Sequence, residues 1–236
     1  MNSNDLTLCQ EKLRYFGSML PAFAHEAKNG LAVINENAGL LGDYILLAQR
    51  GKDLNLEKLG QMSAKIKAQV NRLDTLITDV RRAADGIDNG QRNVCLIHHV
   101  RQVSDLLSRN AATRSIQFHV EAREDSIAIH TRPVLLLHMI WSCLDYAMHI
   151  SDPGRHIKLI IEKQTEGGRL NISGISSSTP ITVNEIMPEA ARHLVLSSLE
   201  ADLTVDKDQP AIALTFSASP PVASGESVLN RSLNRP

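Results

Sequence analysis

The chain has 236 residues, a formal net charge of −1 and 43% hydrophobic residues, while aromatic residues make up only 3%. This length suffices for one large domain or for two small ones with a proper core. The near-neutral charge gives no reason to expect nucleic acid or an anionic membrane surface as a partner. We therefore predict that the chain binds neither.

No membrane span, secretion signal or metal site is expected. The sequence lacks a run of about 18 apolar residues, and its first ten residues are polar and acidic rather than basic and then apolar. Cys9, Cys95 and Cys143 are widely spaced and form no metal or redox motif, which favours reduced cytosolic thiols. The nine histidines show no zinc-site spacing. We expect a cytoplasmic protein without a bound metal.

Two amphipathic stretches at the start of the chain predict two helices. In each, apolar or small residues recur in steps of three and four, a heptad pattern that only Asn37 clearly interrupts. The first set is Leu13, Phe16, Leu20, Phe23, Ala27, Gly30, Ile34, Asn37, Leu41, Tyr44 and Ala48. The second is Leu59, Met62, Ile66, Val70, Leu73, Ile77, Val80 and Ala84. Between them, Gly51 suits the position after a helix end, and Asp53 or Asn55 suits an N-cap.

These stretches predict an antiparallel helical hairpin over residues 1–84. Two helices alone do not enclose a heptad seam well, whereas two hairpins paired as a four-helix bundle bury it. We therefore expect a homodimer. The alternative is a hairpin that packs on the C-terminal domain of its own chain.

The polar, glycine-containing residues 85–93 predict a linker to a second domain over residues 94–218. Helices are expected there over 97–109, 134–150 and 188–199, and strands over 115–121, 126–130, 156–163, 169–175, 201–206 and 211–217. This order predicts an α+β chain whose second domain is a two-layer α/β sandwich. Residues 219–236 are expected to form a disordered tail.

One motif on the first helix can carry chemistry. The segment 23–31 reads Phe-Ala-His-Glu-Ala-Lys-Asn-Gly-Leu, and its heptad positions place His25 on the solvent side. Glu26 adjoins the histidine, and Asn29 follows one turn later. Pro21, four residues before His25, is expected to start or kink the helix. A neutral imidazole is a competent nucleophile toward phosphorus, and a neighbouring carboxylate fixes its tautomer.

This segment resembles the H-box of sensor histidine kinases, His-Glu-x-(Lys/Arg)-(Asn/Thr)-Pro-Leu, although Gly30 replaces the proline. The matching residues are His25, Glu26, Lys28, Asn29 and Leu31. The resemblance implies that His25 accepts a phosphoryl group and that Glu26 orients and deprotonates its ring. It implies that Asn29 holds water or the phosphoryl group in the reverse or phosphatase reaction, and that Lys28 and Leu31 contact a partner.

The second domain resembles the ATP-binding domain of the same kinases. Residues 139–151 resemble its N-box, with matches at Leu144, Asp145, Ala147 and Ser151. The asparagine that holds Mg²⁺ in the family is replaced by Tyr146, and an earlier asparagine by Ser142. A phenol is a poor substitute for an amide oxygen at magnesium. We read Tyr146 as a packing residue.

The glycine-rich boxes of the family are also missing. Ser176 stands where the adenine-binding aspartate is expected, and Ser178 and Pro180 stand where the glycines are expected. Residues 189–194, where the later glycine-rich box of the family is expected, contain no glycine. Because phosphoryl transfer from ATP depends on positioning and metal electrostatics, we expect no autophosphorylation by ATP.

A phosphoacceptor histidine beside a degenerate ATP site resembles the dimeric histidine phosphotransferases. The resemblance implies that His25 exchanges phosphate with the aspartate of response-regulator receiver domains, which supply Mg²⁺, so that this chain binds no cofactor. Three alternatives stay open. They are a divergent histidine kinase, an adaptor that transfers no phosphate, and a receiver phosphatase that acts through Asn29.

Overall fold

The computed structural model describes residues 2–85, 90–175, 181–206 and 210–217. The helices are α1 (Ser3–Gln49), α2 (Leu56–Asp85), α3 (Leu96–Thr113), α4 (Pro133–Ile150), α5 (Val183–Ile186) and α6 (Glu189–Leu199). The strands are β1 (Arg92–Cys95), β2 (Gln117–Ala122), β3 (Ala128–Thr131), β4 (His156–Lys163), β5 (Gly168–Ser173), β6 (Ala201–Asp206) and β7 (Ala211–Phe216). The tail predicted over 219–236 lies outside the described residues.

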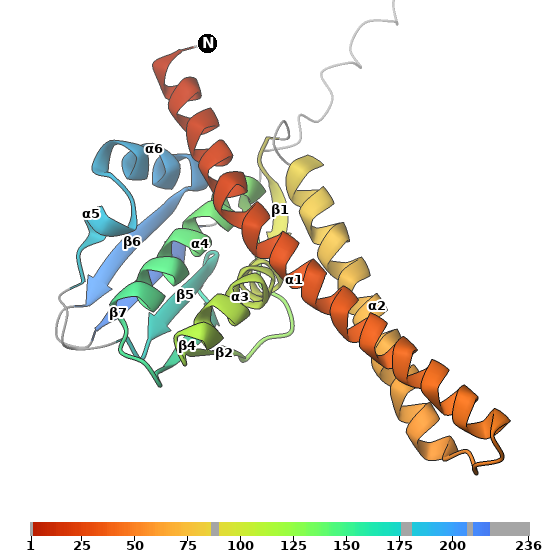
Figure 1. Ribbon diagram of the computed structural model, residues 1–236. Coiled ribbons are helices and arrows are strands. Elements are labelled where there is room, and N and C mark those ends of the chain that lie inside the picture. Colours follow the sequence, from red (N-terminus) through yellow and green to blue (C-terminus); the bar gives the residue numbers. More distant parts are fainter. Residues whose placement is uncertain (1, 86–89, 176–180, 207–209, 218–236) are drawn as a thin grey trace, which may run out of the picture.

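The helical hairpin is confirmed, with α1 and α2 lying side by side along their length (Figure 1). Asn2 caps α1, because its side chain accepts a hydrogen bond from the backbone N–H of Asp5. Gly51 follows the end of α1 with a φ of +80°, a conformation that glycine adopts without strain. The Asn55 side chain accepts from the backbone N–H of Lys58 at 3.0 Å and caps the start of α2. These caps fix where the chain turns.

The first helix begins ten residues before the predicted start and continues through Pro21. Proline inside a helix removes one backbone hydrogen bond, so packing must offset that loss. The packing is visible at Tyr15 and Met19, whose side chains are fully buried. The expectation that Pro21 starts the helix is therefore wrong. The part of α1 that precedes His25 begins at Ser3, whereas the predicted seam began at Leu13.

The single chain encloses only part of the predicted seam of α2. Val70 and Ile77 are 49% and 56% exposed in the single chain, while Leu73, Leu76 and Val80 are shielded. Helix α2 carries two apolar stripes. The stripe that faces α1 includes Leu76, the residue before Ile77 of the predicted seam. A heptad count cannot choose between stripes that both fit its spacing.

A five-stranded sheet in the order β2-β4-β5-β7-β6 forms one layer of the second domain. β2 and β4 are parallel, and the other neighbours are antiparallel. Every second residue of β4 is buried, including Leu159 and Ile161, which fits a sheet with one covered face. Helices α3, α4 and α6 form the second layer (Figure 1). The two-layer α/β sandwich is confirmed.

A small antiparallel ladder of β1 and β3 stands apart from the main sheet. It begins at Arg92, inside the predicted linker 85–93, and it pairs with residues predicted as a strand over 126–130. The chain therefore enters the second domain through an ordered strand.

Helix α4 is the centre of this domain. Pro133–Ile150 is the one helix in the described part of the chain that is long and apolar enough to cross a membrane, and 78% of it is buried inside the fold. Polar or charged residues interrupt the apolar run at His138, Ser142, Asp145 and His149, as expected from the sequence, although the mean hydropathy of the helix remains high. Burial on this scale is typical of a core helix.

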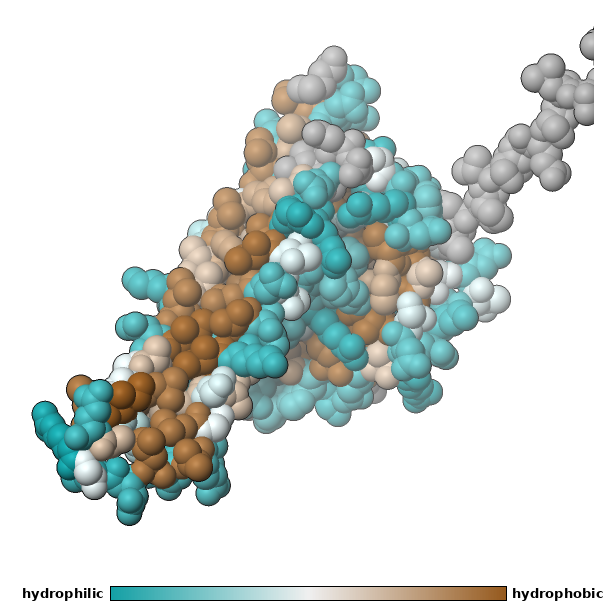
Figure 2. All heavy atoms as spheres, turned by 90° about the vertical axis from the view of Figure 1, so that its right-hand side faces the viewer, coloured by the Kyte–Doolittle hydropathy of each residue, from teal (hydrophilic) through white to brown (hydrophobic). Residues whose placement is uncertain are grey.

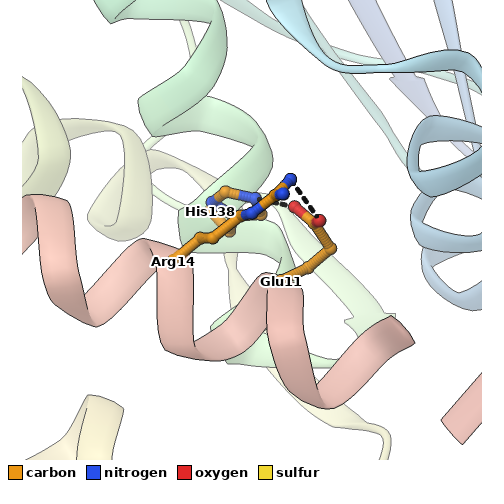
Figure 3. Close-up of polar contacts among 3 residues, drawn as sticks. All are labelled: Glu11, Arg14 and His138. Carbon is orange, nitrogen blue, oxygen red and sulfur yellow. Dashed lines mark hydrogen bonds and ion pairs between the residues drawn. The ribbon is translucent and has the colours of Figure 1, made fainter. Parts of the chain in front are cut away.

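The beginning of α1 lies across the helical layer of the second domain (Figure 1). The Tyr15 ring packs edge-on against Trp141 of α4, with centroids 6.1 Å apart. Glu11 Oε2 lies 2.9 Å from Nε2 of the buried His138, and its other oxygen lies 2.9 Å from Arg14 (Figure 3). For this part of α1, the alternative of a hairpin packed on its own C-terminal domain is correct.

Candidate functional site

His25 lies on the exposed side of α1, about midway along the helix. Its neighbour Ala24 is also exposed and is small, so another protein has room to approach the ring. No hydrogen bond or ion pair within the described part of the chain involves the imidazole. The prediction that His25 faces solvent agrees with this geometry, and both ring nitrogens are available to a partner.

Glu26 points in a different direction. Neighbouring residues on a helix project about 100° apart, and this rotation turns Glu26 toward α2. Its carboxylate lies 2.6 Å from an Arg72 guanidinium nitrogen, and its side chain is only 14% exposed. The carboxylate expected to orient His25 is therefore held by an arginine of the second helix.

Sequence reasoning missed Arg72. The residue is polar at a position between two apolar stripes, so it looks like an ordinary solvated arginine. Its role depends on which turn of α2 lies opposite Glu26, and a short loop of uncertain length does not fix that register. A charge complementary to Glu26 on the second helix was the only signal in the sequence.

Asn29 is half-buried one turn after His25. Its side-chain Nδ2 is shielded from solvent and has no hydrogen-bond partner within the described residues. A buried amide without a partner is costly, so this group is available to a ligand or water. Lys28 and Leu31 are both exposed, Leu31 to 58%, and they lie where a docking partner could contact them.

Gly30, which replaces the proline of the H-box pattern, allows the two helices to approach closely. A Cβ atom at this position would lie 2.9 Å from Cδ2 and 3.1 Å from Cγ of Leu73. These distances are shorter than side chains tolerate, so Leu73 fills the space that a side chain would take. The residue thus serves packing between α1 and α2 just beyond the histidine.

A small cavity of about 170 Å³ lies behind the Glu26–Arg72 pair, where α2 faces α3. Asp105 of α3 lines it, and burial raises the pKa of that carboxyl, although the Arg72 charge works against the increase. The charged pair on the hairpin is therefore close to the second domain.

The residues predicted to form a degenerate nucleotide site are only partly placed. Tyr146 is buried, and its hydroxyl oxygen accepts a hydrogen bond of 2.8 Å from the backbone N–H of Thr182. This hydrogen bond links the residues before α5 to α4. Tyr146 occupies the position that the N-box resemblance aligns with the magnesium ligand of sensor histidine kinases. Ser142 is half-buried one turn earlier, while Ser176 and Ser178 lie outside the described residues.

No metal centre is evident in the described part of the chain, where no cluster of three or more histidine, cysteine or acidic side chains is arranged to hold an ion. All three cysteines are free, and burial raises the pKa of the Cys143 thiol to about 12. That thiol is protonated at neutral pH and behaves as a core residue.

No protein-family model and no curated protein matches the sequence. The solved structures that resemble it are histidine kinases, which is the resemblance expected from the sequence. The nucleotide-free catalytic domain of the histidine kinase ThkA is 13% identical, with 56% of this chain and 99% of that one covered at a TM-score of 0.46.

Two longer kinase structures extend the similarity into the hairpin. The Acinetobacter baumannii histidine kinase AdeS is 14% identical over 83% of this chain and 98% of that one, with a TM-score of 0.45. ThkA in complex with the response regulator protein TrrA is 16% identical over 89% of this chain and 64% of that one, with a TM-score of 0.46. At these identities the similarity concerns the fold and says nothing of activity.

Proposed function

We propose that the chain is a dimeric histidine phosphotransferase of a two-component phosphorelay. His25 takes a phosphoryl group from the aspartyl phosphate of one receiver domain and passes it to the aspartate of another. The observation that carries the proposal is the exposed imidazole, which has no partner among the described residues and stands among the residues that match the H-box.

The chemistry needs little from this chain. The lone pair of one ring nitrogen attacks phosphorus, the P–N bond forms, and the P–O bond to the receiver aspartate breaks with its electrons on the leaving carboxylate. The product ring is positive until its other nitrogen loses a proton. Glu26, the next residue in the sequence, can accept that proton once its carboxylate separates from Arg72. The receiver supplies Mg²⁺, and Lys28 and Leu31 contribute to its docking surface.

The absence of autophosphorylation by ATP is part of the proposal. Tyr146 replaces the amide that would hold magnesium, and its hydroxyl is engaged with Thr182. A bulky phenol offers no carboxylate or amide oxygen to a hard cation. A cytoplasmic location fits the three free cysteines.

Dimerisation accounts for the apolar surface of the hairpin. Figure 2 shows a brown band along one of its faces. Large apolar side chains of α1 and α2 remain substantially exposed in the single chain, among them Ile45, Val70 and Ile77. Pairing two hairpins as a four-helix bundle removes such surface from water.

The test supplies phosphate from the receiver side. Purified receiver domains are phosphorylated with radiolabelled acetyl phosphate and Mg²⁺, freed of donor, and mixed with the full chain or with His25→Gln. We expect acid-labile label on the wild type and none on His25→Gln. Label from ATP alone on the wild type would show a kinase, and receivers that keep their label with both proteins would contradict the proposal.

A receiver phosphatase is the second candidate, and the unpartnered Nδ2 of Asn29 favours it. An amide one turn from His25 could hold the attacking water. In the same assay, a phosphatase releases inorganic phosphate without labelling the chain. His25→Gln would then keep much of the activity, and Asn29→Ala would lose it.

A further inference from the structure

A second cavity lies at the junction of the hairpin and the α/β domain. Its volume is about 380 Å³, which lies in the range of small-molecule sites. The end of α2 forms one side, and β1, α3 and the start of α4 form the others. It therefore belongs to neither domain alone.

The floor of this cavity is apolar. Ala83 of α2 and Leu137 of α4 are 3% and 2% exposed, and Pro133 at the start of α4 is also buried. Side chains from both domains thus form an apolar surface that suits the apolar or ring-shaped part of a ligand.

The rim carries more positive than negative charge. Arg82 and Arg92 line the cavity, and among the described lining residues Asp79 is the only acidic one. Asp79 is already shared, because its Oδ1 lies 3.9 Å from Arg82 and 3.6 Å from Nε2 of His98. By contrast, the Arg92 side chain takes part in no hydrogen bond or ion pair within the described part of the chain, although its backbone pairs with Thr131. Its guanidinium is therefore available to bind an anion.

Neutral groups complete the lining. His99 Nδ1 donates to the Cys95 carbonyl at 2.9 Å, so its Nε2 accepts, and burial lowers its pKa to about 4. Asn93 Oδ1 accepts from His130 at 2.9 Å, which leaves the amide N–H groups of Asn93 to donate. The nearly buried Gln102 adds a further amide. His99 Nε2 is therefore a hydrogen-bond acceptor in the cavity wall, and the amides of Asn93 and Gln102 provide donors near the two arginines.

We propose that this junction cavity binds a small organic anion. A carboxylate or phosphate group lies between Arg92 and Arg82, where bidentate pairing with a guanidinium is strong. The apolar or ring-shaped body covers Ala83 and Leu137, and a polar hydrogen on the ligand reaches His99 Nε2.

A ligand in this position touches the hairpin and the α/β domain together. It therefore stabilises the arrangement in which both contact it, by an amount set by its concentration and affinity. Such a site gives the chain a direct chemical input. The proposal does not depend on phosphoryl transfer at His25.

The test uses phenyl phosphate as the probe and the full chain as the protein. Binding is followed by titration calorimetry and by NMR shifts of the cavity residues, with benzyl alcohol as the uncharged control. We expect saturable binding of phenyl phosphate, at least tenfold weaker binding by Arg92→Gln, and partial recovery in Arg92→Lys. Arg81→Gln, an exposed arginine beside Arg82 that does not line the cavity, should bind like the wild type.

Arg92 and Arg81 are exposed, so their variants should melt like the wild type, and the melting curves verify this. The proposal is overturned if phenyl phosphate does not saturate. It is equally overturned if Arg92→Gln binds as tightly as Arg81→Gln, or if benzyl alcohol binds as well as the anion.

Discussion

At the scale of single residues, the Glu26–Arg72 pair determines where the carboxylate next to His25 points. The two groups are 2.6 Å apart, yet the arginine side chain is 53% exposed. Solvent screening keeps the value of such a pair small, about 0.5–1 kcal/mol. A pair of this strength holds Glu26 in the resting chain and can still exchange when a phosphoryl group or a receiver arrives.

A double-mutant cycle measures this coupling. Arg72→Gln, Glu26→Gln and the double variant are compared by urea unfolding, and we expect a coupling free energy of about 0.5–1 kcal/mol. Each single variant leaves the other charge unpaired, so the double variant should lose less than the sum of the two. Strict additivity would mean that the contact contributes nothing in solution.

Gly30 and Gly39 allow a matched comparison on the same helix. Alanine favours a helix by about 1 kcal/mol over glycine, and at Gly39 an added Cβ meets no atom within 4 Å. Gly39→Ala should therefore stabilise the fold. At Gly30 the Cβ meets Leu73 at 2.9 Å, and overpacking of this kind costs about 1–3 kcal/mol.

We accordingly expect Gly30→Ala to be less stable than Gly39→Ala by about 1–3 kcal/mol in urea or thermal unfolding. Adding Leu73→Ala to Gly30→Ala should remove most of that penalty, because the displaced side chain is gone. Equal stability of the two glycine variants would show that the helices separate at no cost.

At the scale of elements, the contact between α1 and α4 depends on a buried charged group. The hydrogen bond from His138 is the main cause that lowers the pKa of Glu11 from its ordinary 4.5, and Arg14 adds to it while burial opposes it. A carboxyl whose pKa is lowered on folding stabilises the fold fully above its unfolded pKa. That contribution is lost as the pH falls through the lower, folded pKa.

The contact between the first turns of α1 and α4 should therefore weaken as the pH falls below 4.5 and through the lower pKa of folded Glu11. The free energy of unfolding is measured between pH 7 and pH 3, and the wild type should lose more of it on the acid side than Glu11→Gln. Arg14→Gln, which alters only the minor partner, should keep most of the pH dependence. Parallel curves for wild type and Glu11→Gln would exclude Glu11 as its source.

The elements were predictable where one periodicity prevailed. The hairpin, the buried helix α4 and the β4–β5 hairpin follow from their apolar spacing and turn residues. The start of α1 was missed because its buried residues, Glu11 and Tyr15 among them, look solvated in a sequence until His138 and Trp141 are brought opposite. Leu76 was left out of the predicted α2 seam, and Arg72 was overlooked, since helix register is a tertiary property.

At the scale of the whole molecule, one continuous helix links the α/β domain to His25. Tyr15 is packed against α4, and His25 follows ten residues later, about 15 Å along the same helix. The α/β domain is thus tied to the base of the hairpin by buried contacts rather than by a linker alone. Such a fixed arrangement suits a docking platform for receivers better than it suits a domain that must deliver ATP to His25.

The proposed dimer also concerns the whole molecule. Burying an exposed Leu, Ile or Val side chain is worth about 1.5–3 kcal/mol. Val70 and Ile77, 49% and 56% exposed in the single chain, lie one heptad apart on α2. Hydrophobic surface repeated at this spacing is what a second hairpin would cover.

We expect the wild type to be a dimer by light scattering and Val70→Glu/Ile77→Glu to be a monomer, because two charges would be buried unpaired at the interface. His25→Gln, altered at an exposed site outside this stripe, should remain a dimer and serves as the control. Far-UV circular dichroism distinguishes dissociation from unfolding. A monomeric wild type, or a double variant that stays dimeric and folded, would show that this stripe does not join two hairpins.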